Sequence, residues 1–117
     1  EDECRHIYGL QKLEDVAVML AGKASEAGMD GVICAGTEAG FIRDKIRPEM
    51  TINTPAIRPE WAIVQGENQN PDRIMTPAKA LRAGATRLVI GKPIMQFPDR
   101  REAVLRTIAE IASVMGN

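Results

Sequence analysis

Two stretches decide the fold: Asp-Gly-Val-Ile-Cys-Ala-Gly at residues 30–36 and Arg-Leu-Val-Ile-Gly at residues 87–91. Each contains a short apolar run that leads into a glycine, which is typical of a strand buried on both faces of a parallel sheet. Each run follows a helical pattern that ends in Ala-Gly, at Gly28 and at Gly84. This faint internal repeat predicts two successive helix–strand units.

The residues around the first strand show the periodicity of amphipathic helices. Apolar positions recur with helical spacing from Leu13, and Gly28 stands where a left-handed C-terminal cap is expected. After the strand, Thr37 is expected to cap a second helix, which must end near Arg47 because Pro48 follows.

The second half of the chain repeats this order. Thr76 and Pro77 predict the start of a helix that stops at Gly84, and residues 50–54 are a weaker strand candidate. A closing helix is predicted from Asp99, with an apolar face formed by Val104, Ile108, Ile111 and Met115. Alternating helices and buried strands with short connections imply parallel strands joined by right-handed crossovers, and hence an α/β layer or barrel.

The predicted sheet is incomplete as a barrel. Three strands cannot close a barrel, and they leave unpaired edges that proteins normally cover. With 117 residues and 12.8 kDa, the chain has room for one domain. We therefore predict that residues 1–117 form a single α/β segment that is not complete by itself.

Composition and charge argue against several classes of protein. Basic and acidic residues number 15 and 16, so the net charge is -1 and nothing favours binding to nucleic acid. The longest mostly apolar run, residues 16–21, is far below the roughly 20 residues that cross a bilayer, and no basic-then-apolar leader opens the chain. The two cysteines, Cys4 and Cys34, are too few for a disulfide framework, which predicts a cytoplasmic protein.

Two strand exits carry residues that could bind an anion. In Thr-Pro-Ala-Ile-Arg-Pro at residues 54–59, two prolines stiffen the backbone around Arg58 and lower the entropy cost of aiming its guanidinium at a phosphate or carboxylate. At residues 90–94, Gly91 lets backbone N–H groups approach an anion and Lys92 adds a positive charge. Both stretches also fit simpler interpretations: a surface arginine in a proline-rich turn, and a solvated lysine in an ordinary loop.

Other candidate residues give weaker signals. The polar run at residues 66–72 is by default a loop, although it could form a lid in which Gln69 donates to phosphate oxygens. Trp61 could cover a ligand, but packing on the body of the protein is the commoner role. His6 is the only histidine, and no His, Cys, Asp or Glu cluster has metal-ligand spacing, so no metal or other cofactor is predicted.

Four blocks of the sequence together resemble the C-terminal half of orotidine 5'-phosphate decarboxylases. They keep that family's order and approximate spacing: Asp-Gly-Val-Ile-Cys-Ala at 30–35, Thr-Pro-Ala-Ile-Arg-Pro at 54–59, Arg-Ile-Met-Thr-Pro-Ala at 73–78 and Leu-Val-Ile-Gly-Lys-Pro-Ile at 88–94. The resemblance implies roughly the last three parallel strands of a (βα)8 barrel, with their helices. It also implies an enzyme that converts orotidine monophosphate to UMP without a cofactor, as a homo-oligomer that is usually a dimer.

The resemblance also assigns roles to individual residues. It implies that Arg58 and Gln69 contact the substrate phosphate, and that Gly91 and Lys92 form the final phosphate-binding pair. Two departures stand out: this chain has Ala56 where the family usually has glycine, and Lys92 where it usually has arginine. Lysine keeps the charge of arginine but loses its bidentate fork, which would lower phosphate affinity.

The catalytic residues of the family lie elsewhere. Its lysines and aspartates, including an Asp-x-Lys-x-x-Asp motif, belong to the first half of the barrel, and residues 1–117 contain no such motif. The resemblance therefore predicts a chain that grips the phosphate, carries no catalytic residue and is inactive alone. Two alternatives stay open. One is a non-catalytic half-barrel that self-associates through its sheet edges, with a vestigial phosphate site; the other is a related phosphosugar enzyme, such as a hexulose-phosphate synthase.

Overall fold

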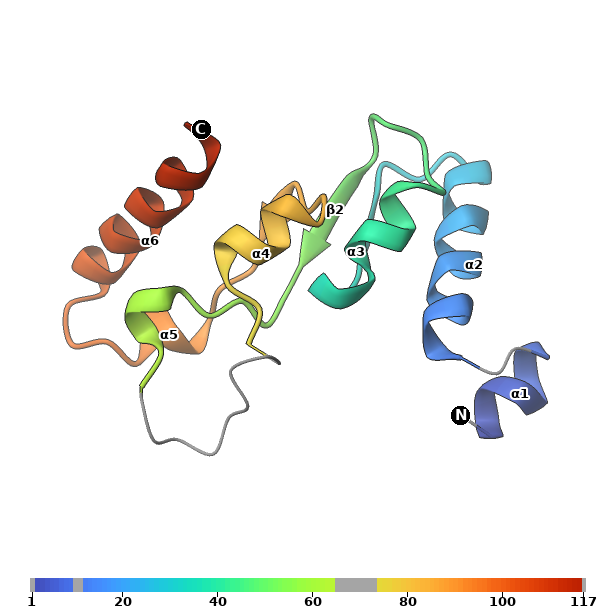
Figure 1. The fold of residues 1–117 in the computed structure, drawn as a ribbon, viewed down its shortest axis with the longest axis horizontal. Helices are drawn as coiled ribbons and strands as arrows, with labels where there is room; N and C mark the ends of the chain where they lie inside the picture. The colour runs from blue at the N-terminus through green and yellow to red at the C-terminus, as the bar shows by residue number, and fades with distance from the viewer. Residues whose placement is uncertain (1, 10–11, 65–73, 117) are drawn as a thin grey trace.

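The computed structural model of the chain describes residues 2–9, 12–64 and 74–116. Its elements follow in the order α1 (Asp2–Tyr8), α2 (Leu13–Glu26), β1 (Gly31–Ile33), α3 (Gly36–Arg43), β2 (Thr51–Thr54), the 3₁₀ turn η1 (Glu60–Ala62), α4 (Pro77–Arg82), β3 (Arg87–Leu88), α5 (Lys92–Met95) and α6 (Arg100–Met115). Figure 1 shows α1 and α6 at opposite ends of the molecule, with β2 between them. None of these helices combines the length and the apolar character that a membrane span requires.

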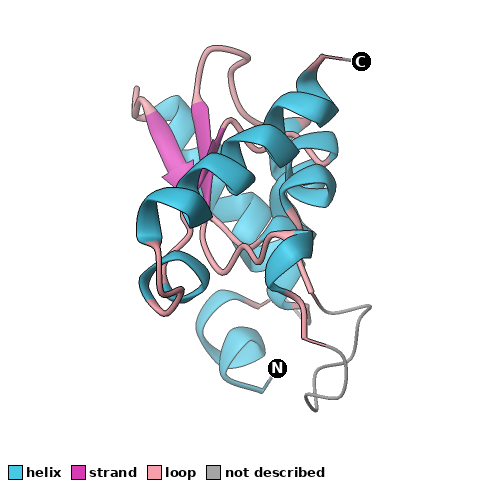
Figure 2. Ribbon diagram, turned by 90° about the vertical axis from the view of Figure 1, so that its left-hand side faces the viewer, coloured by secondary structure: helices cyan, strands magenta, loops and turns pink. Residues whose placement is uncertain are grey.

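The three strands form one parallel sheet in the order β1-β2-β3. Ile33 is paired with Asn53, and Thr54 with Leu88. The weak strand candidate at residues 50–54 is thus the central strand. Figure 2 shows how short the strands are beside the helices that make up most of the molecule. The predicted α/β fold with three parallel strands is confirmed.

The backbone conformation confirms the predicted internal repeat. Gly28 and Gly84 both adopt positive φ, +80° and +106°, after α2 and α4. Only glycine takes up this left-handed conformation without a steric penalty, so each Ala-Gly pair ends its helix and turns the chain toward the next strand. Thr76 caps α4 as predicted, because its hydroxyl accepts a hydrogen bond from the Lys79 N–H at 3.3 Å.

The prediction for the helix after β1 was wrong at both ends. Thr37 is already helical; the N-cap is Ala35, whose side chain makes no capping hydrogen bond. The helix ends at Arg43 rather than near Arg47. Beyond this end the Arg43 guanidinium donates to the Pro48 and Met50 carbonyl oxygens at 3.2 and 2.8 Å, which holds the chain where it turns toward β2.

Two apolar clusters of unequal size hold the elements together. The first core lies between α2, α3 and the β1–β2 part of the sheet, and its buried members are Ala21, Cys34, Ala39, Ile42, Ile46, Met50 and Ile52. The second core lies between α4, β3 and the segment after β2, and its buried members are Ile57, Ala80 and Ala85. With so few aromatic residues in the chain, both cores are aliphatic, as the composition predicts.

The expectation that the strands are buried on both faces was wrong. Side chains alternate along β1, so Val32 and Cys34 meet the first core while Ile33 points to the other face and is 78% exposed. Val89, just after β3, is 54% exposed. The described residues thus leave Ile33 and Val89 largely uncovered on this second face of the sheet.

The face of α6 that packs inward was also predicted wrongly. Its buried residues are Ala103 and Thr107, whereas Val104, Ile108 and Met115 are exposed. Ala103 is small enough to let α6 pack against α4, and the larger apolar side chains are left on an adjacent, exposed face of the helix.

A close contact links the first residue of α3 to the segment before α4. Gly36 lies against the side chain of Met75, and a Cβ atom at position 36 would come within 2.6 Å of Met75 Cγ. Real Cβ atoms essentially never come so close to another atom, so a side chain at position 36 would force the Met75 side chain to move.

Candidate phosphate-binding site

The two predicted anion-binding segments leave neighbouring strands at the same edge of the sheet. Arg58 follows the end of β2 at Thr54, and Gly91 follows the end of β3 at Leu88. Because β2 and β3 are parallel and paired, their carboxyl ends lie side by side. This is the edge at which ligands bind in parallel α/β folds.

Arg58 is half-buried, and its backbone is fixed. Its N–H donates to the Met75 carbonyl oxygen at 2.9 Å, beside a parallel bridge between Ile57 and Met75. One guanidinium nitrogen, Nη1, donates to the Ala62 carbonyl oxygen at 3.3 Å. No carboxylate among residues 2–9, 12–64 and 74–116 forms an ion pair with Arg58, so the rest of its five-donor fork is available to an anion.

Ala56 holds the turn before Arg58 in an unusual conformation. Its φ is +58°, the only positive value for a non-glycine residue in the described part of the chain. An alanine in the left-handed region costs on the order of 1–2 kcal/mol. The position therefore has a backbone that suits glycine, the residue expected there from the family resemblance.

Gly91 and Lys92 form the start of the short helix α5. Gly91 is the N-cap, and its carbonyl oxygen accepts from the N–H groups of Ile94 and Met95 at 3.1 and 3.0 Å. The first N–H groups of a helix have no partner within it. Lys92 is exposed, and in the described part of the structure its ammonium group makes no hydrogen bond or ion pair.

The fourth predicted residue cannot be placed. Gln69 lies in the stretch 65–73, which is outside the described residues.

A junction of aromatic and polar side chains lies next to Arg58. The Trp61 indole N–H donates to the Thr107 hydroxyl at 3.3 Å, and its ring meets Phe97 edge to face, with centroids 5.3 Å apart. The Glu60 N–H donates to the Glu110 carboxylate at 2.9 and 3.2 Å. Trp61 thus packs on the body of the protein, the commoner of the two roles considered for it.

Sequence reasoning missed the partners of Trp61. Thr107 and Glu110 share one helical face with Ala103, at spacings of four and three residues. The large apolar residues of α6 lie on a different face, so apolar periodicity does not indicate this one. Burial raises the pKa of the Glu110 carboxyl, although the hydrogen bond from Glu60 works in the opposite direction.

Two more groups are buried at the strand ends: the Thr54 hydroxyl, which the sequence did not predict, and the Cys34 thiol, which it predicted only as part of the core. The Thr54 hydroxyl at the end of β2 is fully buried and has no hydrogen-bond partner within the described ranges. Cys34 is buried, as expected, and burial together with the nearby Glu38 carboxylate raises the pKa of its thiol. A thiol held in its neutral form fits a packing role.

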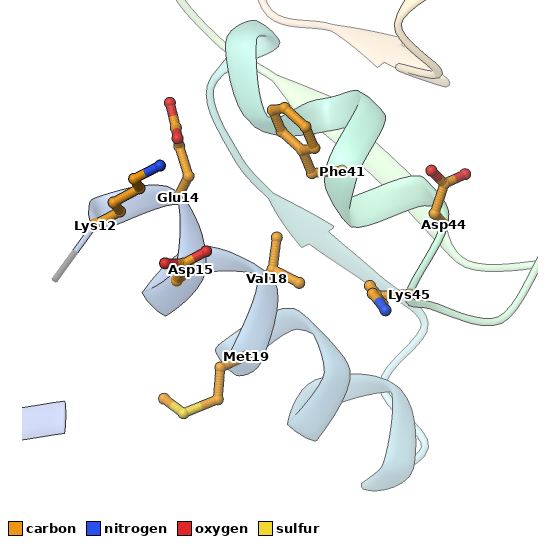
Figure 3. A pocket seen from close by; sticks show the side chains of 8 residues that line it. All are labelled: Lys12, Glu14, Asp15, Val18, Met19, Phe41, Asp44 and Lys45. Atoms are coloured by element: carbon orange, nitrogen blue, oxygen red, sulfur yellow. The ribbon is translucent and has the colours of Figure 1, made fainter. Parts of the chain in front are cut away.

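A cavity of about 730 Å³ lies elsewhere, between α2 and α3. Figure 3 shows the apolar side chains of Val18, Met19 and Phe41 among charged side chains, with Lys12, Glu14 and Asp15 on one side and Asp44 and Lys45 on the other. None of the predicted phosphate-binding residues lines it. The cavity is therefore distinct from the site at the strand exits.

Comparisons with known proteins identify relatives of this chain. Residues 2–107 match the sequence model of the orotidine 5'-phosphate decarboxylase / HUMPS family. The chain is 40% identical over 105 residues to the orotidine 5'-phosphate decarboxylases of two Rhodopseudomonas palustris strains, CGA009 and TIE-1, and the match covers 90% of this chain and 43% of each relative. The chain therefore spans less than half the length of these relatives.

Solved structures give the same result. The orotidine 5'-phosphate decarboxylase of Lactobacillus acidophilus matches with a TM-score of 0.70 and 26% identity, over 95% of this chain and 44% of that one. A protein of Pyrococcus horikoshii with the same enzyme name matches with a TM-score of 0.62 at 24% identity, over 92% of this chain and 45% of that one, and so supports the fold. With the family match over most of its length, the chain belongs to the orotidine 5'-phosphate decarboxylase / HUMPS family.

Proposed function

We propose that this chain supplies the phosphate-binding half of an orotidine 5'-phosphate decarboxylase, the enzyme that converts orotidine monophosphate to UMP. Arg58, Lys92 and the backbone at Gly91 hold the phosphate, with Gln69 as a further contact. The observation that carries the proposal is the parallel pairing of β2 and β3, which sends both cationic segments out at one edge of the sheet. The identity to curated decarboxylases supports the substrate class.

The two cations would play different parts. The Arg58 guanidinium can meet two phosphate oxygens with parallel N–H donors, whereas the Lys92 ammonium acts as a compact point charge. Phosphate binding is remote from the reacting carbon, and its energy helps to orient the substrate in the transition state. The proposed reaction needs no metal or other cofactor, and its proposed setting is the cytoplasm.

The open face of the sheet supports a partner segment that brings the catalytic residues. Ile33 and Val89 are exposed there, and both β1 and β3 are edge strands of the described sheet. The curated relatives are more than twice as long as the matched segment. Since residues 1–117 lack the Asp-x-Lys-x-x-Asp motif, we expect UMP binding without decarboxylation by this chain alone.

Calorimetric titration with UMP tests the site directly. Removing a charged hydrogen-bonding group costs about 1.5–3 kcal/mol, so Arg58→Ala should weaken UMP binding by about 10- to 100-fold. Arg82→Ala is the matched control, because Arg82 is an exposed arginine on α4. Equal affinity of the Arg58 variant and the wild type would remove the assignment.

Complementation tests the enzymatic part of the proposal. The chain would be co-expressed with the N-terminal half of the Rhodopseudomonas palustris decarboxylase, and decarboxylation of orotidine monophosphate would be followed in the purified mixture. We expect activity only with both polypeptides, and its loss with Arg58→Ala. A mixture that forms a complex but stays inactive would contradict the proposed role.

Self-association without catalysis is the second candidate function. It is favoured by the same open face of the sheet and by the exposed apolar residues of α6, Val104, Leu105, Ile108 and Met115. Sedimentation analysis separates the two candidates. A monodisperse dimer without affinity for UMP would support the non-catalytic half-barrel, whereas a homo-oligomer that binds UMP agrees with the enzyme proposal.

A further inference from the structure

We propose that Trp61 and Phe97 are positioning residues that set the spacing between Arg58 and Lys92; this inference rests on the phosphate site proposed above. Trp61 lies just after Arg58 on the exit from β2, and Phe97 lies just after α5 on the exit from β3. Their rings meet edge to face, with centroids 5.3 Å apart and planes at 80°. The contact joins the two strand exits directly.

Both aromatic rings are also anchored on one rigid helix. The Trp61 indole N–H donates to the Thr107 hydroxyl at 3.3 Å, and that hydroxyl donates in turn to the Ala103 carbonyl oxygen at 2.8 Å. The Arg106 guanidinium lies over the Phe97 ring, 5.5 Å from its centroid. Figure 1 shows α5 and the turn after β2 side by side, next to α6. The helix α6 thus provides one frame for both exits.

Arg58, the cation on the exit from β2, is hydrogen-bonded to the turn that carries Trp61. Arg58 Nη1 donates to the Ala62 carbonyl oxygen at 3.3 Å, which fixes the guanidinium to the turn that carries Trp61. That turn is held to α6 by the Glu60 N–H, which donates to the Glu110 carboxylate. Movement of Trp61 would therefore move Arg58.

The cation on the β3 exit has a similar link. Lys92 opens α5, and its carbonyl oxygen accepts from the Gln96 N–H at 2.9 Å. The Phe97 N–H then donates to the Ile94 carbonyl oxygen at 3.3 Å, so Phe97 closes the same turn. A displaced Phe97 would therefore shift α5 and the residue at its start.

The small size of a phosphate group makes the spacing between Arg58 and Lys92 important for binding. A phosphate is small, and two cations on separate loops bind it together only at one separation. Lysine and arginine side chains lose conformational freedom when they are ordered on binding. A scaffold that already holds the loops in place reduces the ordering that binding requires, and so raises affinity.

A double-mutant cycle on UMP affinity tests the inference. Phe97→Leu breaks the edge-to-face contact and no longer fixes the separation of the two cations, so it should weaken UMP binding, by at most about tenfold, the full value of an aromatic pair. Phe97→Tyr keeps the ring and should restore the affinity. In a Lys92→Ala background, Phe97→Leu should have little further effect, because the second cation is then absent. Phe41→Leu, at an exposed aromatic on α3, is the control and should change nothing.

The outcomes separate the inference from the site on which it rests. If Phe97→Leu weakens binding equally with and without Lys92, or not at all, the positioning role is wrong while the phosphate site stands. If Arg58→Ala and Lys92→Ala both leave UMP affinity unchanged, the site and the positioning role fall together. Thermal unfolding monitored by circular dichroism checks that each variant is folded. If Phe97→Leu does not fold, Trp61→Phe takes its place, because it keeps a ring and removes only the indole donor.

Discussion

The two parts of the molecule are stabilised in different ways. In the N-terminal part, α2 and α3 begin without a side-chain cap and pack on the larger first core. In the C-terminal part, α4 and α6 begin at Thr76 and Asp99, whose side chains accept from backbone N–H groups, and the second core is small. Apolar burial is non-directional, whereas hydrogen bonds fix orientation. The part whose helices carry side-chain caps is the one that holds the proposed phosphate site.

The largest expected effect concerns the first core. Ile42 is 2% exposed there, and Ile42→Ala should lower the free energy of unfolding by about 2–5 kcal/mol through lost burial and a new cavity. Ile108→Ala removes the same atoms from a 55% exposed position on α6 and should cost no more than about 0.5 kcal/mol. Urea denaturation measures both. Similar losses at the two positions would contradict the idea that apolar burial dominates the N-terminal part.

Next in size is the loss of a helix cap in the C-terminal part. Thr76→Ala should cost about 1 kcal/mol of unfolding free energy, because the Lys79 N–H loses its acceptor. Thr76→Ser keeps the hydroxyl and should be close to the wild type. Lys12→Ala changes the N-cap of α2, where no side-chain hydrogen bond exists, and should have little effect. A cost at Lys12 equal to that at Thr76 would erase the contrast between the two parts.

Ala56 offers a stabilising change. Ala56→Gly should raise the free energy of unfolding by about 0.5–1 kcal/mol, since relief of the left-handed strain outweighs the added freedom of the unfolded chain. Ala109→Gly in α6 should do the opposite, by about 0.5–1 kcal/mol, because glycine weakens a helix interior. The two variants would be compared by thermal unfolding. A decrease at position 56 would show that the turn does not store strain.

The smallest effect is a pH dependence from Glu110. Burial raises the pKa of its carboxyl in the folded chain, so its contribution to stability is present below the ordinary pKa of 4.5 and is lost as pH rises through the raised pKa. The stability of the wild type relative to Glu110→Gln should therefore fall with rising pH across this range. Glu26→Gln, at the exposed end of α2, is the control. Melting temperatures over a pH series provide the measurement, and parallel curves would exclude the effect.

The sequence predicted the order of the elements better than their burial. The repeat around Gly28 and Gly84 and the cap at Thr76 depend on local backbone chemistry, and the parallel strands follow from the helices that connect them; all three are confirmed. Burial depends on what covers each face, which no local pattern reveals. For that reason the exposed Ile33 and Val89 contradict the prediction of strands buried on both sides.

The candidate site was predictable only in outline. The strand exits at Arg58 and Gly91 follow from motif and strand order. The contacts of Trp61 with Phe97 and Thr107 join residues far apart in the sequence, and the sequence pattern gives no sign that they meet. Long-range pairings of this kind need coordinates.

The contact between Gly36 and Met75 couples substitutions at two positions that are far apart in the sequence. Any side chain at position 36 would push against Met75, whose carbonyl oxygen receives the Arg58 N–H. A substitution at position 36 would thus displace Met75 and, through it, the backbone of Arg58 on the exit from β2. Among homologous chains, we expect a larger residue at 36 to be accompanied by a smaller one at 75, so that the arginine keeps its place.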